Sequence, residues 1–315
     1  MKEFPMQHTI ANSVNCVGIA LHTGAKVSMT LLPAPVHTGI LFQRTDITDR
    51  ANTIPALYSN VTNTMLGTTI SNASGVSVGT IEHLMAALWG CGIDNVIVAL
   101  DGAEVPIMDG SAEPFVFLIE CAGSEMQSAP RRVIEVLKTV EVVEGDKRAA
   151  ISPAAHFGVN LQINFNSDVI SVQNCTFQAT DVSFKTDLSR ARTFGFEHEV
   201  SKLREMGLAL GGSLDNAIVV SGDKVLNKEG LRYKDEFVRH KVLDCIGDVY
   251  LAGGMLMGQI SGVRSGHGLN NKLLHKLFAT KDAWRIATPE MPVVVVQMPV
   301  MAAHQHPSFA EAAHA

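Results

Sequence analysis

The sequence has few cysteines, no long apolar run and no excess of positive charge, and each absence narrows the range of functions. Its five cysteines are odd in number and never form a C-x-x-C pair, so neither a disulfide framework nor a thiolate zinc cluster is indicated. The most apolar run, residues 292–301, is too short to cross a bilayer, and residues 1–13 lack the apolar core of a signal peptide. We therefore expect a cytoplasmic protein that spans no membrane.

The net charge of −6 at pH 7 argues against nucleic acid as a partner, because sequence-independent binding to phosphates needs a basic surface. An anionic substrate would have to be met by a few local cations. With 46% hydrophobic and 18% charged residues, the chain can bury enough surface to fold on its own. At 315 residues it exceeds the usual size of one hydrophobic core, which predicts two domains.

The two halves of the chain have a similar order of elements, which indicates an internal duplication. In the first half we expect a hairpin of strands at 16–21 and 27–32, a helix from Ile81 to Gly90 or Gly92 capped by Thr80, and a buried strand at 95–100. In the second half we expect strands at 133–143, 149–152 and 158–165, a helix at 235–249, and a strand-like stretch at 255–260.

A long excursion, residues 171–231, separates the second hairpin from its helix. It contains a helical run at 197–206 and a glycine-rich apolar stretch at 208–212. A segment of this length inside a compact domain is usually an insertion with its own structure or a functional lid. Beyond about residue 279 the chain is rich in alanine, proline and histidine, and we expect a mobile tail whose role stays open.

The stretch from Arg239 to Asp248 carries the most reactive set of side chains. On a helix, residues four apart lie about 40° apart around the axis, so His240, Asp244 and Asp248 form one polar stripe. An imidazole and a carboxylate one turn apart are a sound half-site for Zn²⁺. The spacing also fits a surface His–Asp pair that only supports the helix, and both interpretations stay open.

Two further places supply the remaining groups of a metallohydrolase. Glu82 and His83 stand at a helix start, where one could bind a metal while the other approaches a water; a solvated glutamate beside an ordinary histidine is the alternative. His267 stands between Gly266 and Gly268 in an expected loop, whose glycines would let a ligand come close, although such loops are also common without function. Together these places provide two histidines and one carboxylate for a zinc ion, a spare glutamate as base and a spare histidine as acid.

With these residues in this order, the sequence resembles the UDP-3-O-acyl-N-acetylglucosamine deacetylase family. The resemblance covers about residues 8–278 and rests on the motifs at 18–24 (GIALHTG), 64–69 (TMLGTT), 79–88 (GTIEHLMAAL), 106–112 (PIMDGSA), 191–196 (ARTFGF), 235–241 (DEFVRHK) and 265–272 (SGHGLNNK). Several motifs in one order are far more specific than any single motif. Gly67 and Gly268 are departures, since the family often has other small residues at these positions.

The resemblance implies an α+β fold of two duplicated domains, each a β-sheet layered with α-helices, with a small insert in each and the active site between them. The expected boundaries are 1–128 for the N-terminal domain, 129–280 for the C-terminal domain and 281–315 for a C-terminal tail. The insert of the second domain, about 194–226, is expected to form an apolar passage for the substrate's acyl chain. Candidate lining residues, for which a core role is an equal alternative where they are apolar, are Val200, Gly212, Ser213, Ala217 and Val219.

The implied reaction removes the N-acetyl group from UDP-3-O-(3-hydroxyacyl)-N-acetylglucosamine by zinc-dependent hydrolysis, the committed step of lipid A, and hence lipopolysaccharide, biosynthesis. By the same resemblance the metal ligands are His83, His240 and Asp244. Zn²⁺ is expected, and Fe²⁺ accepts the same ligands. A fourth position is left for a water, whose proton Glu82 takes during attack on the acetamide carbonyl. His267, oriented by Asp248, then protonates the leaving amine.

The resemblance assigns further residues to the substrate. Thr193 would hydrogen-bond the oxyanion together with the metal, and Lys241 and Phe194 would hold the glucosamine. Lys147 and Arg264 are candidates for contact with the diphosphate. The protein is expected to act on this small molecule as a monomer.

Two other functions compete with this one. A zinc amidohydrolase for another acylated amino sugar would keep the metal ligands and lack the acyl passage. A non-catalytic protein that binds sugar nucleotides would keep the fold and tolerate the loss of Glu82.

Overall fold

Two five-stranded sheets of the same topology form the frame of the computed structural model, which describes residues 5–179 and 184–287. The first sheet has the spatial order β2 (Val14–Ile19), β3 (Lys26–Pro33), β9 (Val96–Leu100), β4 (Ile40–Arg44) and β5 (Thr53–Pro55). The second has the order β12 (Val140–Glu144), β13 (Lys147–Ser152), β20 (Gln259–Val263), β14 (Gly158–Asn164) and β15 (Val172–Gln178). In both, the third and fourth strands run parallel and all other neighbours antiparallel. The duplication predicted from the order of elements is therefore confirmed.

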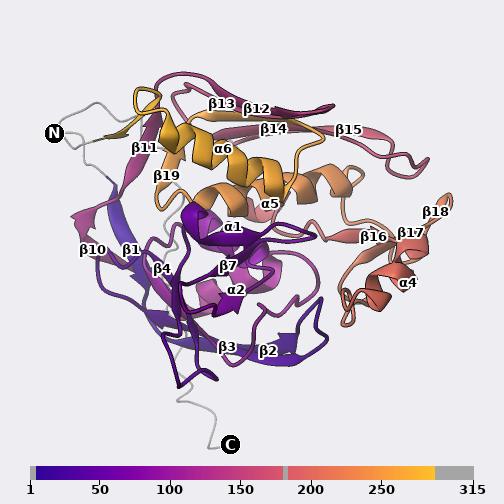
Figure 1. Cartoon of the computed structure of the whole chain (residues 1–315), viewed down its shortest axis with the longest axis horizontal. Helices are drawn as coiled ribbons and strands as arrows, with labels where there is room; N and C mark the ends of the chain where they lie inside the picture. Colours follow the sequence, from indigo (N-terminus) through magenta and orange to yellow (C-terminus); the bar gives the residue numbers. More distant parts are fainter. Residues whose placement is uncertain (1–4, 180–183, 288–315) are drawn as a thin grey trace, which may run out of the picture.

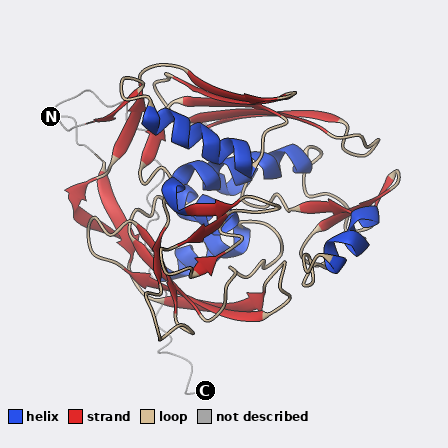
Figure 2. Cartoon of the chain, in the orientation of Figure 1, coloured by secondary structure: helices blue, strands red, loops and turns tan. Residues whose placement is uncertain are grey.

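Helices fill the space between the two sheets, as Figure 1 and Figure 2 show: α1 (Glu82–Gly90), α2 (Glu113–Ala122), α5 (Glu236–Tyr250) and α6 (His267–Ala279). Alternate residues of β3, namely Val27, Met29 and Leu31, are buried, which is the pattern of a strand with one face on the core. Every residue of α1 is buried, because this helix has neighbours on all sides. The fold is thus α+β, as predicted, with the helices as its middle layers.

Smaller elements border these layers. A three-stranded sheet precedes α1 and contains β6 (Val61–Asn63), β7 (Thr69–Ser71) and β8 (Ser77–Val78). A second one projects from the layers at the right of Figure 1 and contains β16 (Phe194–Phe196), β17 (Ile218–Ser221) and β18 (Lys224–Val225), with α4 (Glu197–Glu205) beside it. The other described elements are β1 (Met6–Ile10), η1 (Tyr58–Asn60), β10 (Ser124–Pro130), β11 (Val133–Val136), α3 (Phe184–Asp187), β19 (Met255–Met257) and β21 (Trp284–Ala287).

Four local predictions were wrong. The expected strand at 133–143 is two strands in different sheets, because β11 pairs with β19 and β21 whereas β12 pairs with β13. Thr80 does not cap α1, because its hydroxyl donates to Glu104 Oε1 at 2.9 Å instead. The stretch at 255–260 is not one strand: β19 pairs with β11 and β20 with β13, so the chain passes from one sheet to another at Gly258. His267 does not lie in a loop but is the first residue of α6.

The fold extends past the predicted start of the tail at residue 281. β21 pairs antiparallel with β11, and Trp284 packs against the hydrophobic core. The rest of the predicted tail, 288–315, lies outside the described residues. Among the helices that the structure describes, none is both long enough and apolar enough to cross a membrane.

The backbones of α1 and α5 meet at Gly247. A Cβ atom on Gly247 would lie 2.0 Å from the carbonyl oxygen of Glu82 and 2.8 Å from its carbonyl carbon, so no side chain fits unless the helices separate. Asp244 and Asp248 flank Gly247 along α5, and His83 follows Glu82 on α1. This glycine therefore sets the distance between the polar groups of the two helices.

We predict that Gly247→Ala lowers the free energy of unfolding by about 1–3 kcal/mol, the usual cost of over-packing. That cost exceeds the helix propensity gained on replacing glycine, about 1 kcal/mol. Gly268→Ala in α6 is the matched control, because the nearest neighbour of its Cβ would be the movable hydroxyl of Thr64, 3.3 Å away. Denaturant unfolding compares the two variants. A Gly247→Ala protein as stable as the wild type would show that the contact between α1 and α5 has room for a methyl group.

Candidate metal centre and catalytic cleft

Three buried side chains of ligand type converge where α1 meets α5. His83 comes from α1, His240 and Asp244 come from successive turns of α5, and their ligand atoms all lie within 4.8 Å of one another. The Nε2 atoms of His83 and His240 lie 3.5 Å and 3.3 Å from Asp244 Oδ1. This oxygen is buried without a hydrogen-bond partner among the described residues, a costly state unless a cation sits against it. The donor set and the unmatched oxygen therefore fit a divalent cation.

The surroundings hold two of these ligands, His240 and Asp244, in the ionisation states that bind metal. Burial lowers the pKa of His240 to about 3, so its imidazole is neutral at pH 7. Its Nδ1 lies 3.0 Å from the carbonyl oxygen of Ala191 and donates to it as N–H, which leaves the Nε2 lone pair facing Asp244. Burial opposes the charge of Asp244, but the cationic Lys241, which donates to Oδ2, holds the pKa of that carboxyl well below its usual range. A neutral imidazole and an ionised carboxylate are the forms that coordinate a cation.

Glu82 lies beside the ligand group and is a candidate base. Its side chain is buried at the start of α1, and its Oε2 accepts a 2.9 Å hydrogen bond from the backbone N–H of Thr68. Burial raises the pKa of the Glu82 carboxyl, although the charge of His267 opposes the shift. A raised pKa makes a carboxylate a stronger base near neutral pH. Gly67 leaves room for it, since a Cβ there would lie 3.0 Å from Glu82 Oε1.

His267 and Asp248 form a hydrogen-bonded pair next to the same group. His267 Nδ1 donates to Asp248 Oδ2 over 2.8 Å, and Nε2 lies 3.9 Å from Asp244 Oδ2. Burial opposes the charged imidazole, but Asp248, helped by Glu82 and Asp244, raises the pKa of His267 to about 9. The imidazole is therefore protonated at pH 7 and has a proton to give.

A cavity of about 590 Å³ opens over these groups. It brings together ten residues singled out from the sequence: Glu82, His83, Lys147, Thr193, Phe194, His240, Lys241, Asp244, Arg264 and His267. Five others, predicted to line an acyl passage, belong to the second insert and do not line this cavity: Val200, Gly212, Ser213, Ala217 and Val219. A Cβ on Gly212 would lie 3.7 Å from Leu21, which does line it. The second insert thus lines the cavity directly through Phe194 of β16, and around Gly212 it adjoins Leu21.

Two kinds of cation face the cavity. Lys241 Nζ donates to Asp244 Oδ2 at 2.8 Å and lies 5.8 Å from the centre of the Phe194 ring. Lys147 and Arg264 are exposed, and Arg264 pairs with Asp146 at 2.7 Å. One lysine therefore belongs to the buried centre, whereas the other two cations form part of its solvent-exposed rim.

Two polar residues that hold Glu82 and Asp248 in place had no predicted role. Thr68 bonds Glu82 through its backbone and Asp248 through its hydroxyl, and Asn270 Nδ2 donates to Asp248 Oδ2 at 2.8 Å. They stand in the motifs at 64–69 and 265–272, and their polar character was the only signal that the sequence offered.

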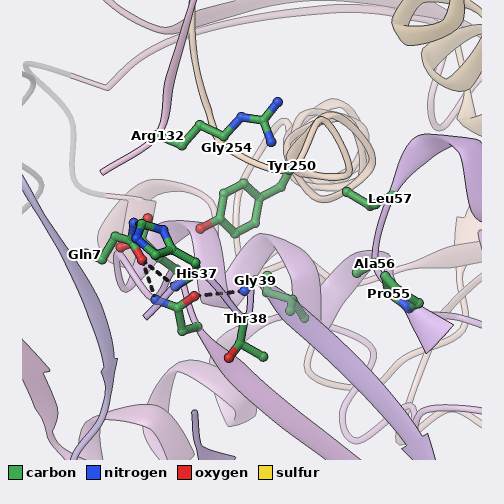
Figure 3. A pocket seen from close by; sticks show the side chains of 14 residues that line it. Gln7, His37, Thr38, Gly39, Pro55, Ala56, Leu57, Arg132, Tyr250 and Gly254 are labelled. Atoms are coloured by element: carbon green, nitrogen blue, oxygen red, sulfur yellow. Dashed lines mark hydrogen bonds between the residues drawn. The ribbon is translucent and has the colours of Figure 1, made fainter. Parts of the chain in front are cut away.

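A smaller cavity, of about 300 Å³, lies where the end of α5 meets the N-terminal strands, and Figure 3 shows Tyr250 directed toward Gln7 and His37 there. Its amide groups bond one another: Asn95 Nδ2 donates to Gln7 Oε1 at 2.9 Å, and Asn95 Oδ1 accepts from the N–H of Gly39 at 2.8 Å. Its lining includes no member of the metal-ligand group. The reactive groups of the chain therefore face the larger cavity.

Comparisons with known proteins point to one family. A profile of the family described as UDP-3-O-acyl N-acetylglycosamine deacetylase matches residues 7–279. Similar proteins named UDP-3-O-acyl-N-acetylglucosamine deacetylase occur in Phenylobacterium zucineum (51% identical over 282 residues), Hahella chejuensis (52% over 286) and Marinobacter nauticus (53% over 284). Each alignment covers 90% of this chain, and the three cover 96%, 94% and 93% of the relatives.

We predict that the metal-free protein loses stability as the pH rises from about 6.5 to about 9. The pKa of His267 is raised on folding. Its contribution to the free energy of unfolding is therefore fully present below the pKa of the unfolded state, 6.5, and is lost as the pH rises through about 9. Urea unfolding at a series of pH values measures the effect, and His267→Gln should flatten the curve within this window. A wild-type curve as flat as that of His267→Gln would contradict a charged His267–Asp248 pair.

Proposed function

The chain belongs to the UDP-3-O-acyl N-acetylglycosamine deacetylase family, and on that premise we propose that His83, His240 and Asp244 hold the divalent cation of its reaction. The observation that carries the proposal is the convergence of these side chains on the buried, unmatched Asp244 Oδ1, with Glu82 beside them. The chain is an enzyme that deacetylates UDP-3-O-acyl-N-acetylglucosamine: hydrolysis of the acetamide gives a free amine and acetate.

Zn²⁺ is the metal we favour, because two imidazoles and one carboxylate are a common ligand set of catalytic zinc, although Fe²⁺ accepts the same ligands. When bound, such a cation acts as a Lewis acid and lowers the pKa of a water that reaches it. The site suits this choice, since His240 is neutral and Asp244 ionised without any change in protonation.

Proton transfer falls to Glu82 and His267. Glu82, held by the N–H of Thr68, takes a proton from the water that attacks the acetamide carbonyl. The hydroxyl of Thr193 donates a hydrogen bond to the oxyanion that develops there. His267, kept cationic by Asp248, gives its Nε2 proton to the nitrogen as the C–N bond breaks. The amine therefore leaves neutral, and the acetic acid formed loses its carboxyl proton to solvent as acetate. The proton that Glu82 took from the water returns to His267, so both groups regain their starting states.

The substrate's polar and apolar parts meet different walls of the cavity. Asp244 raises the pKa of Lys241 against the effect of burial, so this cation is available, together with Phe194, to hold the glucosamine. Lys147 and Arg264 at the rim meet the diphosphate. The acyl chain runs along the second insert, past Val200, Gly212, Ser213, Ala217 and Val219. This passage separates the proposed substrate from other acylated amino sugars.

We also place the chain in lipid A biosynthesis, acting in the cytoplasm as a monomer. The five cysteines are all free, as a reducing compartment would keep them.

The division into domains is proposed at residue 128/129, with the second domain ending at Ala287 rather than at 280, because β21 belongs to its sheet structure.

Glu82→Gln is expected to keep its metal and to lower kcat by about 10²- to 10⁴-fold, because an amide cannot take the proton. Asp244→Asn is the matched comparison, since it removes a ligand and should lower the metal content as well. Elemental analysis and acetate release from UDP-3-O-acyl-N-acetylglucosamine, before and after chelation, measure both. Turnover that survives chelation would argue against a role for the metal. Unchanged turnover in Glu82→Gln would show that Glu82 is not the base.

Gly212→Leu is expected to lower kcat/KM for a long acyl chain by about tenfold relative to a short one, because the new side chain enters the proposed passage beside Leu21. Ser201→Leu, exposed on α4 of the same insert, controls for added apolar surface. Competition between long-chain and short-chain substrates gives the ratio directly. An equal loss for both chain lengths would place Gly212 outside the passage.

A further inference from the structure

Thr68 touches both halves of the proton-transfer machinery. It lies in the first insert, by which we mean the three-stranded sheet of β6, β7 and β8 (residues 61–78) that precedes α1. It stands immediately before β7, and only 2% of it is exposed. Its backbone N–H donates to Glu82 Oε2 at 2.9 Å, and its hydroxyl donates to Asp248 Oδ1 at 2.6 Å. One residue thus bonds the candidate base on α1 and the carboxylate on α5 that orients His267.

The hydroxyl of Thr68 has a specific place in the bonding of Asp248. Asp248 Oδ2 accepts from His267 Nδ1 and from Asn270 Nδ2, both at 2.8 Å. Within residues 5–179 and 184–287, the bond donated to Oδ1 by a side chain comes from Thr68 alone. Thr68 Oγ1 also lies 3.3 Å from His267 Nδ1. The hydroxyl therefore fixes the rotation of the carboxylate and, through it, the direction of the imidazole.

We propose that Thr68 is a positioning residue that fixes the base and the proton donor in position relative to each other. Its backbone fixes Glu82, and its hydroxyl fixes His267 through Asp248. The catalytic role of Thr68 rests on the proposed function, whereas its positioning of Glu82 and Asp248 rests on the hydrogen bonds alone. It gives the first insert a task in the reaction that is distinct from lining the cavity.

Replacement by valine separates the two bonds. Thr68→Val keeps the backbone N–H that holds Glu82 and nearly the same shape, and it removes only the hydroxyl that holds Asp248. Thr68→Ser keeps both donors. Thr69→Val removes a hydroxyl from the neighbouring, half-buried residue of β7 and is the matched control.

Steady-state kinetics, metal content and thermal unfolding of the three variants test the proposal. We expect Thr68→Val to lose about 10- to 100-fold in kcat, the usual effect of removing an outer-shell partner, with KM within about twofold of the wild type and full metal content. Thr68→Ser should recover most of the rate, and Thr69→Val should resemble the wild type. A Thr68→Val enzyme with wild-type kcat, or a serine variant as slow as the valine one, would overturn the proposal.

A second measurement does not depend on turnover. The Nδ1–H proton that His267 donates to Asp248 should give a downfield proton resonance, assigned by its absence in His267→Gln. We expect Thr68→Val to shift or broaden it and Thr69→Val to leave it in place. An unmoved resonance in Thr68→Val would contradict the positioning role. Were the wild type inactive as a deacetylase, the proposed function would fail, and this resonance would still decide the role of Thr68.

Discussion

The site depends on the close approach of two helix backbones. Gly247 of α5 meets the carbonyl group of Glu82 of α1, at a distance that leaves no space for a Cβ atom. Because the two helices come from opposite halves of the duplicated fold, this contact joins the ligand of one half, His83, to the ligands of the other, His240 and Asp244. The two outer sheets enclose the helix layers (Figure 1 and Figure 2). The reactive side chains gather where α1 meets α5.

Burial at this point concentrates negative charge. Glu82, Asp244 and Asp248 are each buried, and Lys241 and His267 are the charged partners placed among them. The carboxylates raise the pKa values of Lys241 and His267 against the effect of burial. Burial raises the pKa of Glu82. Uncompensated buried charge is costly, so a divalent cation against Asp244 Oδ1 would relieve the centre as well as serve the reaction.

Part of this arrangement could be predicted from the sequence. The helical period alone puts His240, Asp244 and Asp248 on one stripe. Glu82, His83 and His267 could also be singled out as candidates, but only the family resemblance gave each of them its role. The meeting of the two helices could not be predicted, because nothing in the sequence around a helical glycine says which backbone it touches. The bonds of Thr68 to Asp248 and His267 join residues 180 and 199 positions apart, which no local pattern encodes. Flanking glycines suggested a loop at His267, whereas Gly266 is extended and α6 begins directly after it.

One divalent cation is expected to bind between the two halves of the chain. Anomalous diffraction from crystals grown with Zn²⁺, recorded on both sides of the zinc absorption edge, tests it most directly. We expect one strong peak about 2.0–2.2 Å from a nitrogen of His83, a nitrogen of His240 and an oxygen of Asp244. A peak bound to only one of the two helices, or no peak within reach of all three side chains, would contradict it.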